Sequence, residues 1–196
     1  MRRVRAIMED LTGWVPYLEW DEAQVALLAG DTALAEVKLR RAYEALRRTG
    51  EKSQLSTLAI DLADVLYLHG HHEDAEEFTR VSKETAAADD LASQIRWRTV
   101  QAKVLAREGR TNEADRLAHA GVALAERTDY LSWRAAALMD LATVLWDLSR
   151  PAEANARARE AIVLFEQKGN VAAAQRAQRA LTSGGRRPGV ARPGPT

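Results

Sequence analysis

The chain has 196 residues, with 28 Lys and Arg against 28 Asp and Glu, and it contains no cysteine. The absence of cysteine excludes disulfides, thiolate zinc sites and thiol nucleophiles, and the balanced charge gives no general reason to bind nucleic acid or an anionic membrane. Because 46% of the residues are hydrophobic, the chain can bury a core and we expect one folded domain.

Glycine and proline divide the chain into long helical segments. Gly30, Gly70 and Gly109 each close an apolar run, and Ser149, followed closely by Pro151, takes the same place in the next run. Glycine adopts the left-handed conformation beyond a helix end at little cost, and proline is tolerated in a first helical turn. Alternating strand patterns are missing. In chain order we expect helices near 15–29, 32–48, 52–69, 72–88, 90–108, 111–126, 130–148, 151–168 and 170–182.

Aligning the turns reveals a repeat of about 40 residues, with three columns of small residues. The first column is alanine in all four copies: Ala23, Ala63, Ala102 and Ala142. The second is also alanine throughout: Ala35, Ala75, Ala114 and Ala154. The third is small: Ala42, Ser82, Gly121 and Ala161. Small residues let the two helices of a hairpin approach closely, so we expect four stacked helix hairpins and a final capping helix.

The spacing Ala63…Gly70…Ala75…Ser82 resembles the tetratricopeptide repeat (TPR), lengthened here from 34 to about 40 residues. This resemblance implies an all-α fold, a right-handed α-solenoid of antiparallel helix hairpins, over residues 15–182. Residues 1–14 would be a partial helix of a preceding repeat. Residues 183–196 form a basic Gly/Pro tail, whose composition predicts disorder.

Shorter stretches carry a more specific resemblance. Segments 103–110, 124–129 and 164–170 are similar to the C-terminal TPR arrays of bacterial, chiefly actinobacterial, signalling proteins. Those proteins combine a class III adenylate/guanylate cyclase domain, an ATPase domain and the array. The resemblance implies that this chain is the C-terminal part of, or related to, a cyclase- or transcription-regulator-type protein. No cyclase or ATPase activity is implied, because the cyclase carboxylates and a G-x-x-x-x-G-K-[ST] loop are missing.

No motif in the sequence indicates an enzyme, a metal or a cofactor. The histidine-rich segment 69–74 lies at a turn and lacks the i, i+4 spacing of helical metal ligands, so we interpret it as a solvated turn. Carboxylate pairs such as Asp61 and Asp64 fit solvated helix faces better than general acid/base work. We therefore expect a non-enzymatic protein without a cofactor.

The resemblance implies a protein–protein interaction or regulatory module that binds a partner peptide or helix on the concave face of the array. The residues implied to face the partner are Tyr17, Trp20, Gln24, Asp64, Tyr67, Arg96, Thr99, Lys103, Met139 and Trp146. An alternative for Trp20, Tyr67 and Trp146 is packing under neighbouring helices.

A second function remains open at this stage: a small-molecule-sensing helical repeat domain of a transcriptional activator. The sequence also leaves a homo-oligomer open, and its negative body argues against a nucleic-acid partner. Because no signal peptide and no apolar run near ~20 residues is present, we expect a cytoplasmic protein without a membrane span.

Overall fold

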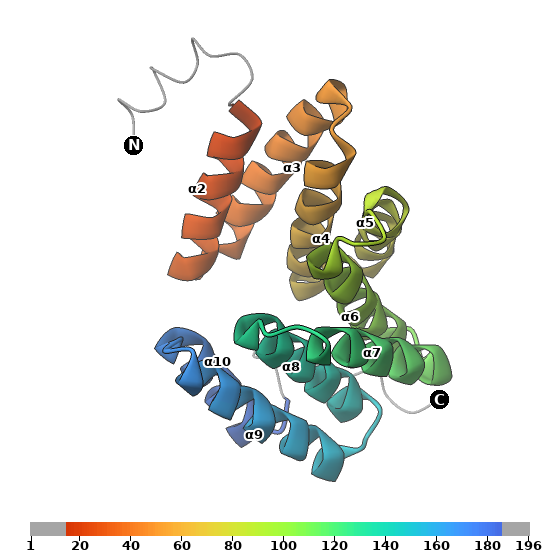
Figure 1. Ribbon diagram of the computed structural model, residues 1–196, viewed down its shortest axis with the longest axis vertical. Coiled ribbons are helices and arrows are strands. Elements are labelled where there is room, and N and C mark those ends of the chain that lie inside the picture. The colour runs from red at the N-terminus through yellow and green to blue at the C-terminus, as the bar shows by residue number, and fades with distance from the viewer. Residues whose placement is uncertain (1–14, 186–196) are drawn as a thin grey trace. The chain divides into compact units, whose positions relative to one another are not determined.

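The computed structural model describes residues 15–185, and within them every regular element is an α-helix (Figure 1). The expectations for residues 1–14 and 186–196 lie outside this range. None of the described helices combines the length and the apolarity needed to cross a membrane. The helices are α2 (Val15–Ala29), α3 (Thr32–Thr49), α4 (Lys52–His69), α5 (His72–Thr85), α6 (Leu91–Arg107), α7 (Thr111–Glu126), α8 (Leu131–Asp147), α9 (Pro151–Gln167) and α10 (Val171–Thr182).

The helix boundaries agree with the predicted ones to within one residue, except at the end of α5. This helix was predicted to reach residue 88 but ends at Thr85, because the Ala86 backbone is extended. The Asp90 side chain accepts a hydrogen bond from the backbone N–H of Ser93, so it caps the start of α6. Residues 86–88, which the sequence assigns to this helix, therefore belong to the connection between α5 and α6.

The turns that close α2, α4, α6 and α8 share one backbone geometry. In each turn one backbone N–H donates to the carbonyl five residues earlier, at 2.9–3.0 Å: Asp31 to Ala26, His71 to Leu66, Arg110 to Leu105 and Arg150 to Leu145. The residue before each donor has a positive φ, and it is glycine in the first three turns. Ser149 adopts a φ of 59° in the fourth turn. A non-glycine residue there carries a strain of roughly 1–2 kcal/mol.

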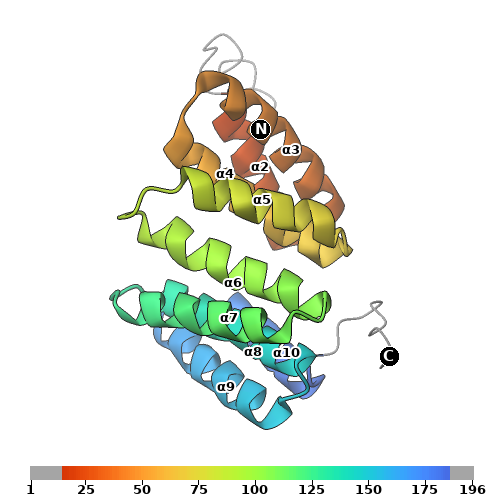
Figure 2. The same ribbon diagram turned by 90° about the vertical axis from the view of Figure 1, so that its right-hand side faces the viewer.

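The chain divides into two compact units, the first ending at Ser93 and the second beginning at Gln94. In the first unit α2 packs against α3, α3 against α4, and α4 against α5. In the second unit α7 packs against α8, α8 against α9, and α9 against α10 (Figures 1 and 2). Each unit therefore contains two consecutive hairpins of the sequence repeat, and α10 follows the second of them in the second unit.

The three small-residue columns lie in the core of these units, as the repeat analysis predicts. All eight alanines of the first two columns are 0% exposed, and the third column is buried throughout. At Gly121 an added Cβ would lie 2.5 Å from Cγ2 of Thr99, so α7 approaches α6 more closely than an alanine would allow. The small residues thus set the distance between packed helices.

The left-handed turn positions give a test in which two substitutions should change the free energy of unfolding in opposite directions. We expect Ser149→Gly to raise the free energy of unfolding by about 1 kcal/mol and Gly109→Ser to lower it by a similar amount. Nothing lies within 4 Å of a Cβ added at Gly109, so strain alone should act there. Urea unfolding followed by circular dichroism measures both changes. If the two substitutions change the free energy of unfolding in the same direction, backbone strain at Ser149 is not the cause.

Candidate functional site

Three of the predicted partner-facing residues, Tyr17, Trp20 and Gln24, follow one side of α2. The Trp20 indole Nε1 donates to Oδ2 of Asp61 on α4 at 2.7 Å, and Gln24 Nε2 donates to the same oxygen at 3.0 Å. The Tyr17 hydroxyl donates to Oε2 of Glu51 at 3.0 Å, and this hydrogen bond, with burial and the Glu51 charge, raises the pKa of the phenol. One carboxylate, Asp61, therefore joins two of these side chains to the next hairpin.

The second unit repeats this arrangement with different side chains. Thr99 Oγ1 on α6 donates to Oδ2 of Asp140 on α8 at 2.7 Å, and Lys103 Nζ lies 2.7 Å from Asp140 Oδ1. The donors again precede the acceptor by 41 and 37 residues. The Lys103 residue is only 4% exposed. We call each arrangement, Asp61 with its two donors and Asp140 with its two donors, a carboxylate clamp.

The clamp acceptors occupy one column of the repeat, two residues before the first alanine column. This column reads Asp21, Asp61, Val100 and Asp140. The sequence analysis interpreted such acids as solvated helix faces. The signal that could have revealed them is that the carboxylate recurs in register with the alanines, in the second and fourth hairpins.

Tyr67 and Trp146 are buried, in agreement with the packing alternative. The Tyr67 ring lies 5.6 Å from the His72 ring, centroid to centroid. Trp146 Nε1 donates to Oδ1 of Asn155 at 3.1 Å, and a Cβ added at Gly185 would lie 2.6 Å from the indole. The backbone at Gly185 therefore packs directly on the Trp146 ring, which distinguishes residues 183–185 from the disordered tail expected from composition.

The ten predicted site residues are divided between the two units. Tyr17, Trp20, Gln24, Asp64 and Tyr67 belong to the first unit, and Arg96, Thr99, Lys103, Met139 and Trp146 to the second. Asp64, Arg96 and Met139 are half-buried, whereas Gln24 is exposed. Thr99, Lys103, Tyr67 and Trp146 are buried, so the predicted stripe contributes packing in both units.

The histidine-rich turn is held by contacts that the sequence analysis did not anticipate. His69 Nδ1 lies 2.6 Å from Oε2 of Glu36, and Nε2 lies 2.9 Å from the Thr32 hydroxyl, both on α3. Burial opposes ionisation of Glu36, but hydrogen bonds from Arg40 and His69 outweigh it and lower the pKa of this carboxyl. Within the described residues no three His or acidic side chains are grouped as metal ligands. His69 thus joins the first hairpin to α4.

A groove in the second unit is an accessible site that the sequence did not indicate. It has a volume of about 280 Å³ and lies between α7, α8 and α9. The residues that line it are Val122, Glu126, Arg134, Leu138, Glu160, Val163 and Leu164. Four of them are apolar and three are charged. We call this surface the α7–α9 groove.

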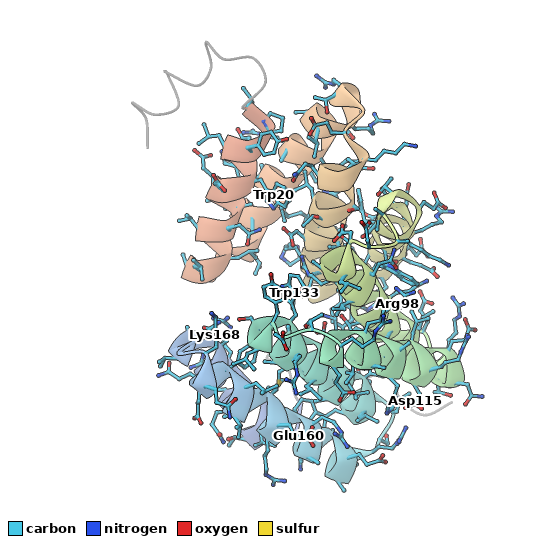
Figure 3. The ribbon with its side chains drawn as sticks, in the orientation of Figure 1. Trp20, Arg98, Asp115, Trp133, Glu160 and Lys168 are labelled. Atoms are coloured by element: carbon cyan, nitrogen blue, oxygen red, sulfur yellow. The ribbon has the colours of Figure 1, made fainter. Side chains whose placement is uncertain are left out.

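One of the charged residues of the groove forms an ion pair at its edge. Glu160, labelled on α9 in Figure 3, pairs with Arg157 at 2.8 Å. An apolar floor with charged neighbours suits one apolar side chain flanked by charged residues. The groove therefore combines an apolar surface with charged residues at its edge.

Comparison with known proteins defines the fold class only. No known protein-family model matches the sequence, and no curated protein does. Among solved structures the chain is similar to the crystal structure of BtubC (BKLC) from P. vanneervenii, with a TM-score of 0.58 and 15% sequence identity. The match covers 100% of this chain and 91% of that chain. At this identity the likeness concerns the all-α fold and not the function.

The two carboxylate clamps should differ in their contribution to stability. We expect Asp140→Ala to lower the free energy of unfolding by about 3 kcal/mol, because it removes the carboxylate that lies 2.7 Å from the buried Lys103 ammonium group. Asp61→Ala should cost about 1 kcal/mol, since Trp20 and Gln24, which donate to Asp61, are neutral and less buried than Lys103. Chemical denaturation measures both values.

The exposed Asp129→Ala provides a matched control for the loss of a surface carboxylate, and it should change stability by less than about 0.5 kcal/mol. An Asp140→Ala variant no less stable than the Asp129→Ala variant would contradict the clamp in the second unit.

Proposed function

We propose that this protein is a protein-interaction module of TPR-like helical repeats that binds a partner polypeptide through the α7–α9 groove. The observation that carries the proposal is the apolar floor of this groove, formed by Val122, Leu138, Val163 and Leu164, beside the charged Glu126 and Glu160. Apolar contacts surrounded by a polar rim are typical of protein–protein contact sites. The buried alanine columns and the shared turn geometry support the repeat architecture.

The repeat alignment supports a dedicated role for Val163. This valine is 49% exposed, although it lies nine residues after the second alanine column. The equivalent residues in the first two hairpins are Glu44 and Glu84, as expected for exposed positions, and the third has Ala123. An exposed valine where other copies carry a charge gives no stability to the isolated fold. Contact with a partner is a physical reason for it.

The size of the groove favours a polypeptide over a small molecule. Pockets for drug-sized ligands occupy about 300–1,000 Å³ and bury most of the ligand. The α7–α9 groove, at about 280 Å³, lies at the lower end of this range, and the half-exposed Val163 is among the residues that line it. The alternative of a small-molecule sensor would be supported instead by a rise in melting temperature with nucleotides or sugars that Val163→Arg abolishes.

Binding of a partner to the predicted concave stripe has less support than binding to the α7–α9 groove. Four members of the stripe are buried, and two of these, Thr99 and Lys103, already bond to Asp140. A role in a bacterial cyclase- or transcription-regulator-type system rests on the sequence resemblance. In-frame cyclase or ATPase sequence in the DNA upstream would support that context, and an in-frame stop with a ribosome-binding site would remove it.

The groove can be tested by the variant Val163→Arg in the full chain. We expect at least a tenfold loss of the proteins retained from a lysate of the source organism, because a charge is placed in the apolar part of the contact at a cost of about 2 kcal/mol. Quantitative mass spectrometry of the retained proteins gives the ratio. Titration calorimetry with the purified partner then confirms direct binding.

Val171→Arg is the matched control, since Val171 on α10 is also exposed, at 62%, and does not line the groove. It should retain the same proteins as the wild type. The proposal fails if Val163→Arg also retains them, or if both variants lose them equally.

A further inference from the structure

The first hairpin exposes apolar side chains that the other hairpins bury. Val25 lies two residues after the first alanine column and is 56% exposed. Its counterparts Val65, Val104 and Val144 are at most 2% exposed. Val65 and Val144 lie on α4 and α8, which pack against α3 and α7 of the preceding hairpin in their units. Val25 occupies the position that such a helix would cover.

The neighbouring positions of this hairpin are also unusually apolar. Leu28 is 77% exposed, and Leu34 and Val37 on α3 are exposed as well. The counterparts of Leu34 in the other three hairpins are all acidic: Asp74, Glu113 and Glu153. The apolar residue at the Leu34 position is therefore specific to the first hairpin, whereas the counterpart of Leu28 in the second hairpin, Leu68, is also an exposed leucine. We call Val25, Leu28, Leu34 and Val37 the α2–α3 patch.

A pocket lies within the patch. It has a volume of about 280 Å³, and Glu22, Val25, Ala26, Ala29, Asp31, Leu34 and Lys38 line it. Leu28, the most exposed of the patch residues, does not line the pocket. The hairpin thus carries both an apolar projection and an apolar recess, the two parts that knobs-into-holes packing requires.

Charges at the two edges of the patch have opposite signs. Asp21 precedes Val25 by four residues on α2, and Arg41 follows Val37 by four residues on α3, so each continues the exposed stripe of its helix. Both side chains are exposed. Asp21 is also the first member of the column whose members Asp61 and Asp140 accept hydrogen bonds from the preceding hairpin.

These charges lie at similar heights along the hairpin. Asp21 lies nine residues before the Gly30 turn and Arg41 eleven residues after it, while α2 and α3 run side by side in opposite directions (Figure 1). A two-fold axis parallel to the helices would place α2 of one copy across α3 of another at the same height. Asp21 of each copy would then oppose Arg41 of the other, so the face is complementary to itself in charge.

We propose that the α2–α3 patch binds a second copy of this chain, forming a symmetric dimer. In this dimer Leu28 of each copy enters the pocket of the other, and the two Asp21–Arg41 pairs fix the register. The dimer uses a surface of the first unit and is independent of the α7–α9 groove, so it goes beyond the proposed function.

The dimer is tested with the full chain by light scattering during size-exclusion chromatography and by sedimentation equilibrium. We expect the mass of a dimer at concentrations from about 1 to 100 μM. Leu28→Asp should give a monomer with unchanged circular dichroism, because the residue is exposed within one copy. Val171→Asp, a change at an exposed valine outside the patch, should remain dimeric.

A charge exchange tests the proposed orientation. Asp21→Arg and Arg41→Asp should each weaken the dimer about tenfold, because each places two pairs of like charges opposite one another. The double variant should restore the affinity to within about threefold of the wild type. Loss of affinity that the double variant does not restore would contradict this pairing and with it the proposed dimer.

A monomer at about 100 μM, or a dimer that survives Leu28→Asp, would overturn the proposal. A monomer would mean that the patch is covered by a different partner or by another part of the same chain. If the protein is monomeric while Val163→Arg still loses its retained proteins, the proposed function stands and only the dimer is wrong. If neither effect is seen, both proposals fail.

Discussion

Close approach of helices at the three small-residue columns is the constraint on which the other contacts depend. The eight alanines of two columns are completely buried, and at Gly121 even a methyl group would collide with Thr99. Larger side chains would separate the helices and open gaps that the core cannot fill. With the helices held this close, Thr99 and Lys103 on α6 reach the carboxylate of Asp140 on α8.

Polar residues on the first helix of a hairpin therefore form contacts with the next hairpin, and these contacts compete with binding of a ligand. Lys103 is buried, and the Asp140 carboxylate offsets part of the cost of burying its charge. The two surfaces that we propose to contact other molecules lie where single hairpins depart from the repeat. Leu34 replaces an acid, and Val163 stands where two hairpins have glutamate. In a repeat protein, departures of this kind carry more information about binding than the conserved-looking columns do.

The sequence was sufficient for the helices and the core because both depend on local signals. Glycine turns mark the helix ends, and the alanine columns identify the buried faces. The end of α5 could not be predicted, because three alanines at 86–88 favour helix while the Asp90 cap decides the outcome. The clamps and the α7–α9 groove were also missed. Their contacts join residues some 40 positions apart in the sequence. Which of the many charged residues come into contact depends on the rotation of each helix about its axis.

Val100 is the one member of its column that cannot form a clamp. A valine side chain accepts no hydrogen bond, so the acidic column is interrupted in the third hairpin, and a clamp carboxylate recurs from Asp61 to Asp140 at twice the repeat length. Each clamp joins the first helices of two consecutive hairpins, so the two hairpins of such a block should unfold together rather than one after the other.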